Sequence, residues 1–254
     1  MNIAVVGAGG VGGYFGGMLA LGGNEVTFVA RGANLDAIVK NGITIVTDKN
    51  QVQVSVAATD DPSAVDTVDL VIFAVKTYDT RPAIDGLSSL LANGASVLTL
   101  QNGVESYLQL GEMLGDAHIL PGAAYIESRI QSPGVIRQSG EVVRIVFGEV
   151  DGSKSARVAR IHRTFTNAGI NCELSGDVIK TLWTKFLFIA SVAGITSASR
   201  ARIGDLLKQP GYMDLLLNTM REIEKVGRAR GVKPDEEVIR DPHRLCPFGL
   251  GAGL

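Results

Sequence analysis

The feature that most constrains this sequence is a stretch near its start, VGAGGVGGYFGGMLA, which carries seven glycines in fifteen residues. A glycine inside a helix or strand costs roughly 0.5–1 kcal/mol relative to alanine, so this density needs a reason. An apolar run, Ile3 to Val6, comes directly before the glycines, and a helix-like segment continues to Leu21. The order strand, tight turn and helix, with glycines at Gly7, Gly9 and Gly12, is typical of a dinucleotide-binding unit.

Each glycine of this turn has a specific use in such a unit. Gly7 permits the tight turn, Gly9 lets the backbone approach a pyrophosphate, and Gly12 lets the helix close onto its strand. The N–H groups that open the helix then face the phosphates. A glycine-rich turn without a ligand is the alternative when the motif is taken alone. We predict that the turn itself binds the cofactor, through Gly7, Ala8, Gly9, Gly10, Val11 and Gly12.

The end of the next apolar run, NEVTFVARG, bears on which cofactor is bound. A unit that binds NAD usually carries Asp or Glu at this place, for the ribose 2′-hydroxyl. Here the run ends Val29-Ala30-Arg31, with a guanidinium that can bind a 2′-phosphate through paired hydrogen bonds. An ordinary solvated arginine at a strand end is the alternative. Because the acid is missing and a base is present, we predict NADP rather than NAD, with Arg31 as a cofactor-binding residue.

Apolar runs and helix-like runs alternate through the first two-thirds of the chain, as a mostly parallel sheet requires. Helix-like segments follow Gly12, Ala33, Asp79 and Val104. The apolar runs are NIAVVG, EVTFVA, ITIVT, DLVIFAVK, ASVLTL and HILPGAAYI. Two further runs, GVIRQSG and RIVFGEV, lie close together around turn residues and indicate antiparallel strands at one edge of the sheet.

The character of the sequence changes after Gly152, and from about Lys154 it indicates helices. These are SARVARIHRTFTNAG, DVIKTLWTKFLFIASVAGITSASR and GYMDLLLNTMREIEKVGRARG. The sequence therefore predicts an α/β fold, in which a Rossmann-type, mostly parallel sheet domain is followed by an all-helical C-terminal domain. We place the boundary near Gly176, which gives domains at 1–176 and 177–254.

Composition excludes several classes of protein. A net charge of −2 and a pI near 5.9 give no electrostatic reason to expect a nucleic-acid partner. Cys172, Cys246 and three histidines form no spaced metal motif. The chain opens directly into a strand and not a signal peptide, and its longest apolar stretch is broken by Lys185 and short for a membrane span. We expect a cytoplasmic protein without a metal site or a membrane partner.

Two strand exits carry polar side chains, and open sheets of this kind bind ligands beyond the carboxyl ends of their strands. DLVIFAVKTYDT places Lys76 after one strand, where it can join Arg31 beside the cofactor. ASVLTLQNGVES places Gln101, Asn102 and Gly103 after the next. The alternatives are a solvated lysine and an asparagine that only caps a helix or turn.

Lys185 stands alone on an apolar helical stripe. No carboxylate shares that stripe, whose members are Thr181, Leu182, Phe188, Ile189, Val192 and Thr196. A lysine held against apolar surface loses solvation of its charged form, which lowers its pKa toward a value useful for proton donation. The alternative is a lysine whose amine reaches water past its own apolar stem.

Taken together, these segments resemble the ketopantoate reductases (2-dehydropantoate 2-reductases). The resemblance runs from Met1 to about Val232. Its most specific parts occur in order and at plausible spacing: VVGAGGVGGYFGGMLA, FVARG, FAVKTYDT, LQNGVES, GEVDGS and LWTKFLFIASVAGITSASRARIG. One such motif can arise by chance, whereas six in register do not.

The resemblance implies an N-terminal NADP-binding domain, a C-terminal helical domain and a substrate cleft between them. It implies that Arg31 and Lys76 contact the 2′-phosphate and that Asn102 belongs to both the cofactor site and the active site. Lys185 matches the family's catalytic lysine, so the implied catalytic residues are Lys185 and Asn102. The implied reaction is reduction of 2-dehydropantoate to pantoate by NADPH, in pantothenate biosynthesis. Lys185 as an ammonium would stabilise the developing negative charge and donate the proton.

The sequence departs from the family in two places. Members commonly carry asparagines one and two helical turns after the lysine, where this chain has Ile189 and Ala193. A later family segment supplies a serine for the substrate carboxylate and a glutamate, and this chain ends before it. Its last residues, DPHRLCPFGLGAGL, have no helical period and resemble a frayed or out-of-frame tail.

These departures leave three functions open. The first is the family reaction with turnover reduced by the shortened helical domain, and the second is reduction of another branched 2-oxo acid. The third is a protein that binds NADPH and no longer catalyses. In each case we expect a homo-oligomer, such as a dimer, because a shortened helical domain exposes apolar surface that a second chain can cover.

Overall fold

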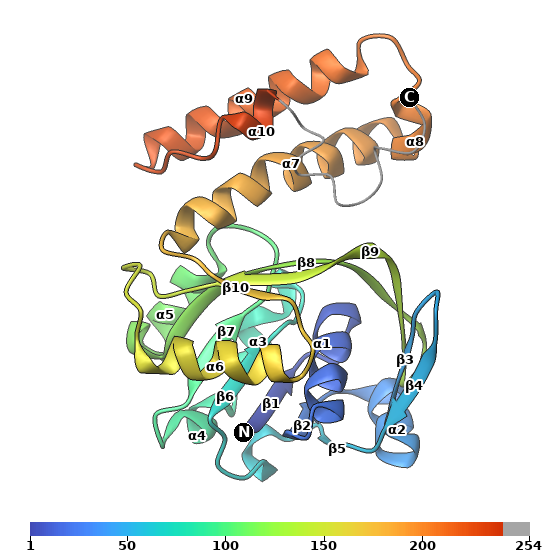
Figure 1. The fold of residues 1–254 in the computed structure, drawn as a ribbon, viewed down its shortest axis with the longest axis vertical. Coiled ribbons are helices and arrows are strands. Elements are labelled where there is room, and N and C mark those ends of the chain that lie inside the picture. The colour runs from blue at the N-terminus through green and yellow to red at the C-terminus, as the bar shows by residue number, and fades with distance from the viewer. Residues whose placement is uncertain (241–254) are drawn as a thin grey trace. The chain divides into compact units, whose positions relative to one another are not determined.

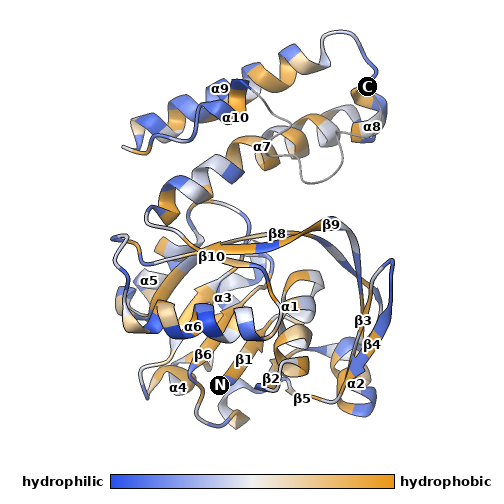
Figure 2. Ribbon diagram, in the orientation of Figure 1, coloured by the Kyte–Doolittle hydropathy of each residue, from blue (hydrophilic) through white to orange (hydrophobic). Residues whose placement is uncertain are grey.

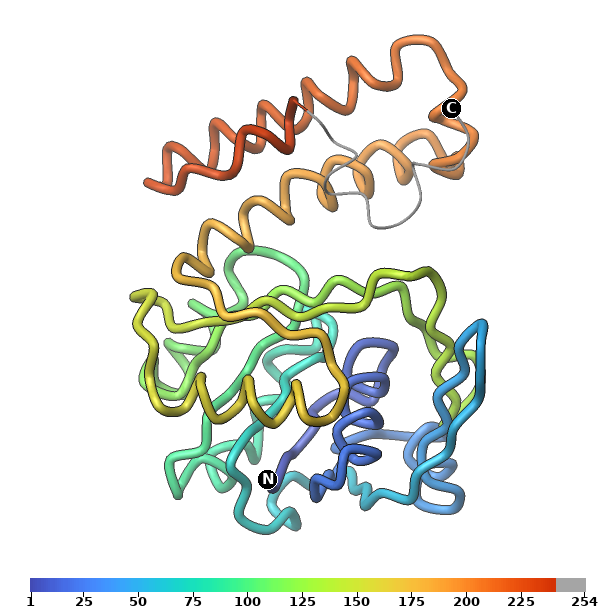
Figure 3. Tube along the Cα trace, in the orientation of Figure 1, coloured from blue at the N-terminus to red at the C-terminus, as the bar shows by residue number. Residues whose placement is uncertain are grey.

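The structure is a computed structural model that describes residues 1–240. The tail predicted at 241–254 lies outside the described residues. The chain divides into two compact units, Met1–Val178 and Ile179–Leu254, so the boundary that the sequence predicts near Gly176 lies beside this division. Figure 3 traces the chain from the blue N-terminus through the first unit and into the orange helices of the second.

A parallel sheet forms the centre of the first unit, with strands in the order β5-β2-β1-β6-β7-β8. The bounds are β1 Asn2–Val6, β2 Glu25–Val29, β5 Ala57–Thr59, β6 Leu70–Phe73, β7 Ser96–Thr99 and β8 Ile119–Ser132. The chain leaves β1 toward β2 on one side and returns to β6 on the other. Such a reversal of strand order next to β1 creates a crevice at the carboxyl ends of β1 and β6, where open α/β sheets bind their ligands.

Both faces of this sheet are covered, which explains why its strands are almost wholly apolar. Successive residues of β1 point to opposite faces. Ile3 and Val5 pack in one apolar cluster with helices α1 (Gly10–Leu21) and α6 (Ala156–Asn167). Ala4 and Val6 pack in a second cluster on the other face, with helices α3 (Thr80–Ile84), α4 (Leu87–Leu91) and α5 (Ser106–Leu114). Figure 2 shows blue, hydrophilic positions on α6, as expected of a helix with one face in solvent.

The glycines of α1 have a second use, which is close packing. A Cβ on Gly13 would lie 2.7 Å from Cδ1 of Ile136, and one on Gly16 would lie 2.6 Å from Cζ of Phe28. Because contacts this short do not occur, a side chain at either position would force Ile136, Phe28 or α1 itself to move, and glycine lets α1 lie close to the sheet without such a shift. The density of glycines near the start of the chain therefore reflects both the turn and the helix that follows it.

A second group of strands extends the sheet beyond β8, and here the structure corrects the sequence. GVIRQSG and RIVFGEV fall largely within one strand, β9 (Val135–Phe147), which pairs antiparallel with β8. ITIVT forms β3 (Ile43–Val46), which lies outside the parallel series and pairs with β9 and with β4 (Gln51–Val54). The β8–β9 ladder shifts register at two irregularities, which bend such long strands and let them cross from one part of a sheet to another.

Three short strands were not predicted from the sequence. They are β4, β5 and β10 (Cys172–Leu174), and β10 interrupts a region where the sequence indicates only helices. Each is three or four residues long, too short for an alternating pattern to stand out. The remaining elements of the first unit are α2 (Gly32–Asn41) and 3-10 turns at Pro62–Ala64, Thr77–Asp79 and Asp116–His118.

The second unit consists of helices in the part that the structure describes. They are α7 (Val178–Ser199), α8 (Ile203–Leu206), α9 (Tyr212–Ala229) and α10 (Glu237–Arg240), as labelled in Figure 1. Their apolar core joins residues of α7 such as Leu187 with residues of α9 such as Leu216 and Met220. A Rossmann-like sheet domain followed by a helical domain confirms the predicted fold class.

Helix α7 is long and apolar enough to cross a membrane by length and composition. It has 22 residues, and its most apolar 18-residue window has a mean hydropathy of 1.5, so the helix is longer than the apolar stretch around TLWTKFLFIASVAGIT. One such helix is weak evidence for a membrane span, because the core helix of a soluble protein passes the same test. In α7, Leu187 and Phe188 are buried in the core of the second unit.

Candidate cofactor and active site

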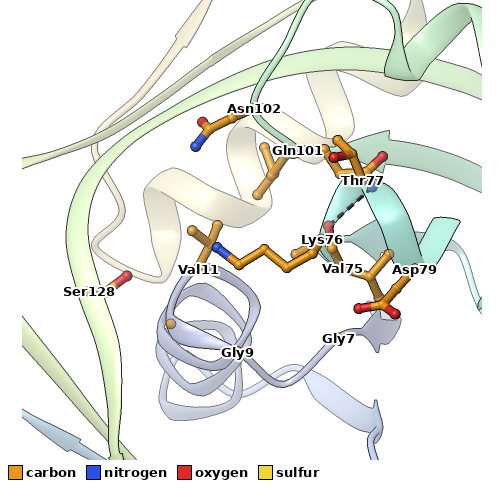
Figure 4. Close-up of a pocket in the computed structure, with 13 residues that line it drawn as sticks. Gly7, Gly9, Val11, Val75, Lys76, Thr77, Asp79, Gln101, Asn102 and Ser128 are labelled. Atoms are coloured by element: carbon orange, nitrogen blue, oxygen red, sulfur yellow. Dashed lines mark hydrogen bonds between the residues drawn. The ribbon is translucent and has the colours of Figure 1, made fainter. Parts of the chain in front are cut away.

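Two adjoining cavities open at the carboxyl ends of the parallel strands. The first, of about 400 Å³, lies between the glycine turn after β1 and the loops after β6 and β7 (Figure 4). The second, of about 660 Å³, follows the end of β2. Both are lined by Gly7, Gly9, Val75 and Asp79, so the two cavities meet over the glycine turn. This is the crevice that the reversal of strand order next to β1 predicts.

The glycine turn requires glycine for different reasons at different positions. Gly7 has φ of +100°, a conformation that other residues rarely adopt, and its N–H donates to the carbonyl of Val29 at 3.1 Å. A Cβ on Gly12 would fall onto the carbonyl oxygen of Gly7. A Cβ on Gly9 would meet nothing within 4 Å, so the turn is open at this residue.

The residues of the glycine turn that the sequence predicts to bind the cofactor differ in whether they line a cavity. Gly7, Gly9, Gly10 and Val11 line the first cavity, and Gly7, Ala8 and Gly9 line the second. Gly12 lines neither cavity and supports the turn from inside the helix.

The start of α1 is suited to an anion. Gly9 caps this helix with no side-chain hydrogen bond, so no side chain occupies the opening N–H groups at this cap. Unsatisfied N–H groups at a helix N-terminus carry partial positive charge and attract phosphate. Together with the open space at Gly9 and the two adjoining cavities, this fits an extended dinucleotide whose pyrophosphate lies over the turn.

Lys76 and Asn102 lie where the sequence predicts, on neighbouring loops at the first cavity. Lys76 directly precedes the 3-10 turn Thr77–Asp79, and its side chain is exposed. Figure 4 shows the Lys76 amine reaching toward Val11 at the glycine turn. Asn102 follows the end of β7 and is also exposed. The first unit thus brings the glycine turn, a cation and an amide to one cavity.

Arg31 lines the second cavity, apart from Lys76. Its Nη2 donates to the carbonyl of Pro82 at 3.4 Å, and its side chain is exposed. The same cavity is lined by Asp60, Asp79 and Asp85. No acid stands at the end of β2, as the sequence shows. Other segments nevertheless bring carboxylates to the second cavity, and no local sequence pattern predicts that they lie there.

Two side chains that hold the site together were missed by the sequence analysis as site residues. Asn34, on α2, donates to the carbonyl of Ala8 in the glycine turn at 2.9 Å. Gln101, which is buried, donates to the carbonyl of Val75 at 3.1 Å. The sequence pattern could have identified Gln101 as a site residue, because it is a polar residue at the end of an apolar strand. No sequence pattern could have identified Asn34, because its partner Ala8 lies 26 residues away in the chain.

Lys185 belongs to the second unit, on α7, and is therefore not among the residues that the first unit brings together. Burial lowers the pKa of Lys185 from 10.5 to about 8. Leu182 and Phe188, one turn to either side, are buried, in keeping with the apolar stripe that the sequence shows. A lysine with such a pKa is an ammonium at neutral pH and still releases its proton readily.

Side chains that could bind a metal do not gather in residues 1–240, where no group of three or more His, Cys, Asp or Glu side chains is found. Cys172 is buried, and burial raises the pKa of its thiol to about 12, which leaves it unreactive. Cys246 lies outside the described residues.

Comparisons with known proteins agree on one family. The model "Ketopantoate reductase PanE/ApbA" matches residues 3–152, and "Ketopantoate reductase PanE/ApbA C terminal" matches 177–246. An uncharacterized oxidoreductase of Bacillus subtilis, YkpB, is 32% identical over 96% of this chain and 80% of its own length. A 2-dehydropantoate 2-reductase of Halobacterium salinarum is 30% identical over 97% of this chain and 81% of its own length.

Solved structures show the same likeness. The crystal structure of 2-dehydropantoate 2-reductase from Porphyromonas gingivalis W83 superposes with a TM-score of 0.88 at 30% identity, over 96% of this chain and 88% of that one. Fold, family models and relatives therefore agree. The chain belongs to the ketopantoate reductase family and is an oxidoreductase of that family.

Proposed function

We propose that this protein reduces 2-dehydropantoate to pantoate with NADPH. The observation that carries the proposal is one groove in which a glycine turn is flanked by two exposed cations, Lys76 in the first cavity and Arg31 in the second. Arg31, in the cavity that we assign to the adenosine end, suits a cofactor with an extra phosphate on that ribose, whereas Lys76 lies in the other cavity, apart from that phosphate. Relatives that bear the name 2-dehydropantoate 2-reductase support the choice of substrate.

The residues of the groove have distinct roles in this proposal. The second cavity, with Arg31, holds the adenosine end of the cofactor, and the glycine turn holds its pyrophosphate. The first cavity, with Lys76 and Asn102, holds the reacting end. When bound, the reduced nicotinamide supplies a hydride to the carbonyl carbon of the 2-oxo acid.

Lys185 supplies the proton. Its ammonium, Nζ, stabilises the negative charge that develops on the carbonyl oxygen and then donates a proton to that oxygen. The pKa of about 8 favours this step, because the group is charged at neutral pH and holds its proton less firmly than an ordinary lysine. Asn102 orients the reacting groups through its amide.

A second candidate substrate is another branched 2-oxo acid with an apolar side chain. Ile189 and Ala193 favour it, because they lie one and two turns after Lys185 on α7 and offer no hydrogen bond to a substrate hydroxyl. A site built to bond a hydroxyl discriminates strongly against analogues that lack it, whereas an apolar site discriminates weakly. A protein that binds NADPH without turnover is the third possibility.

The test is NADPH oxidation measured with 2-dehydropantoate and, in parallel, with branched 2-oxo acids that lack its hydroxyl. A fluorescence titration of NADPH on the same sample measures binding separately. We expect tight binding and turnover with 2-dehydropantoate that is lost in Lys185→Met. Higher kcat/KM with the hydroxyl-free acids would favour the second candidate, and binding without turnover would favour the third.

We further propose that the protein acts in the cytoplasm as a homo-oligomer. Leu215 and Val226 on α9 are about half exposed, at 52% and 54%, and their spacing of eleven residues places them on one face of the helix. Sedimentation equilibrium of the full chain tests whether the protein is a homo-oligomer. A monomer at all concentrations would contradict it.

A further inference from the structure

The amide of Gln101 is built into the wall between the loops of the first cavity. Gln101 directly follows Leu100 at the end of β7 and is only 6% exposed. Its Nε2 donates to the carbonyl of Val75 at 3.1 Å and lies 2.9 Å from Oγ1 of Thr80. The Thr99 hydroxyl donates to its Oε1 at 3.4 Å.

The two partners of Nε2 belong to the residues at the two ends of the turn that carries Lys76, which are Val75 and Thr80. Val75 precedes Lys76 and Thr80 follows the 3-10 turn, which is closed by a hydrogen bond from the N–H of Asp79 to the carbonyl of Lys76 at 2.8 Å. One amide therefore holds both the entry and the exit of this turn. In Figure 4 Gln101 lies beside this turn, and the Lys76 side chain extends from it along the cavity.

Lys76 needs such support because its own side chain is exposed and long. A lysine gains binding energy from an anion only after its backbone and side chain are fixed, and ordering them at the moment of binding weakens affinity. A turn fixed in advance from the neighbouring loop lowers that cost.

We propose that Gln101 is a positioning residue, which fixes the turn 75–80 so that the Lys76 ammonium faces the cofactor. This inference rests on the proposed function in one respect, the binding of a nicotinamide dinucleotide in the first cavity. The fixing of the turn itself does not depend on that binding.

The chain offers a matched control. Gln138, on β9, is also 6% exposed, and its Nε2 donates to the carbonyls of Ser139 and Gly140, both at 2.7 Å. It lines neither cavity. Gln101→Leu and Gln138→Leu therefore remove the same kind of buried amide, but only the first lies against the Lys76 turn.

The first measurement uses no cofactor. Amide hydrogen exchange of the full chain, read at Asp79, reports whether the turn is fixed. We expect exchange at Asp79 to accelerate roughly ten-fold in Gln101→Leu, the scale of one or two lost hydrogen bonds, and to stay unchanged in Gln138→Leu. Unchanged exchange in Gln101→Leu would overturn the proposal.

The second measurement is NADPH affinity in a double-mutant cycle with Lys76→Met. Gln101→Leu should weaken NADPH binding roughly ten-fold when Lys76 is present and less than about three-fold in Lys76→Met, because its effect passes through Lys76. Equal losses in both backgrounds, or an equal loss in Gln138→Leu, would refute the positioning role. If the parent protein binds no NADPH although Gln101→Leu loosens the turn, the proposed function fails and the fixing of the turn by Gln101 stands.

Discussion

The side chain of Asn34 donates a hydrogen bond to the backbone carbonyl of Ala8, over 2.9 Å, and so ties helix α2 to the glycine turn. The other end of the same amide accepts a hydrogen bond from the N–H of Gly134 at 2.8 Å, in the turn between β8 and β9. Ala8 is flanked by glycines, whose backbone is the least restricted of any residue. One amide on α2 thus connects the glycine turn with the turn between β8 and β9.

We expect Asn34→Leu to lower the free energy of unfolding by about 1–3 kcal/mol, because it leaves the Ala8 carbonyl and the Gly134 N–H without their partner. Urea denaturation monitored by fluorescence measures this. Gln53→Leu is a suitable control, since the Gln53 amide also donates to a backbone carbonyl, that of Asn41 at 2.6 Å, but at an exposed site. The control should change stability by less than about 0.5 kcal/mol. Equal effects would argue against a special role for Asn34.

The two glycines Gly9 and Gly12 should respond differently to alanine. A methyl group on Gly9 meets no protein atom within 4 Å, so Gly9→Ala should leave the free energy of unfolding within about 0.5 kcal/mol of the parent. It should nevertheless weaken NADPH binding, because the methyl projects where the cofactor approaches. Gly12→Ala drives its methyl into the Gly7 carbonyl and should cost about 1–3 kcal/mol of stability as well as binding. Urea denaturation and a fluorescence titration separate the two effects, and a destabilised Gly9→Ala would contradict the geometry.

Much of the first unit follows from local pattern. β1, β2, β6 and β7 are short apolar runs separated by helices, and a sheet covered on both faces needs such runs. The pairing of β3 with β9 does not follow from any local pattern, because the partners Thr44 and Val135 lie far apart in sequence and either strand fits several edges. The sequence therefore predicts the parallel centre and not the antiparallel extension.

The site divides in the same way. Gly7, Lys76 and Asn102 are found because they end strands, and parallel strands end at one edge. Asn34 and the acids Asp60 and Asp85 reach the site from segments that no local pattern connects with it. Contacts of this kind depend on tertiary packing, which only the folded chain shows.

Arg31→Ala should weaken NADPH binding by roughly ten- to a hundred-fold, because a charge-assisted contact with a phosphate is worth roughly 1.5–3 kcal/mol. NADH lacks the 2′-phosphate, so its affinity should change little. Fluorescence titrations of both cofactors, on the parent and the variant, measure the difference. The nearby acids Asp60 and Asp85 make this a sharp test: equal affinities for NADPH and NADH in the parent would show that they cancel the effect of Arg31.

Lys185→Met should leave NADPH affinity within a few-fold of the parent and lower kcat by at least roughly a hundred-fold, the scale of a lost acid catalyst. Lys208→Met is the control, since Lys208 is an exposed lysine of the same unit. Parent kcat should also fall as the pH rises through about 8, because the neutral amine has no proton to donate. Turnover that survives in Lys185→Met would show that another group supplies the proton.

Stability gives an independent check on the pKa of Lys185. Below about pH 8 the lysine is charged in both states, and the folded state bears the full cost of burying that charge. Between about 8 and 10.5 the folded protein has lost this proton while the unfolded chain retains it, so the free energy of unfolding should rise with pH across that window. In Lys185→Met this rise should disappear. Urea denaturation of both proteins at pH 7.5, 9 and 10 measures it, and roughly equal pH profiles for the two proteins would contradict a lowered pKa of Lys185.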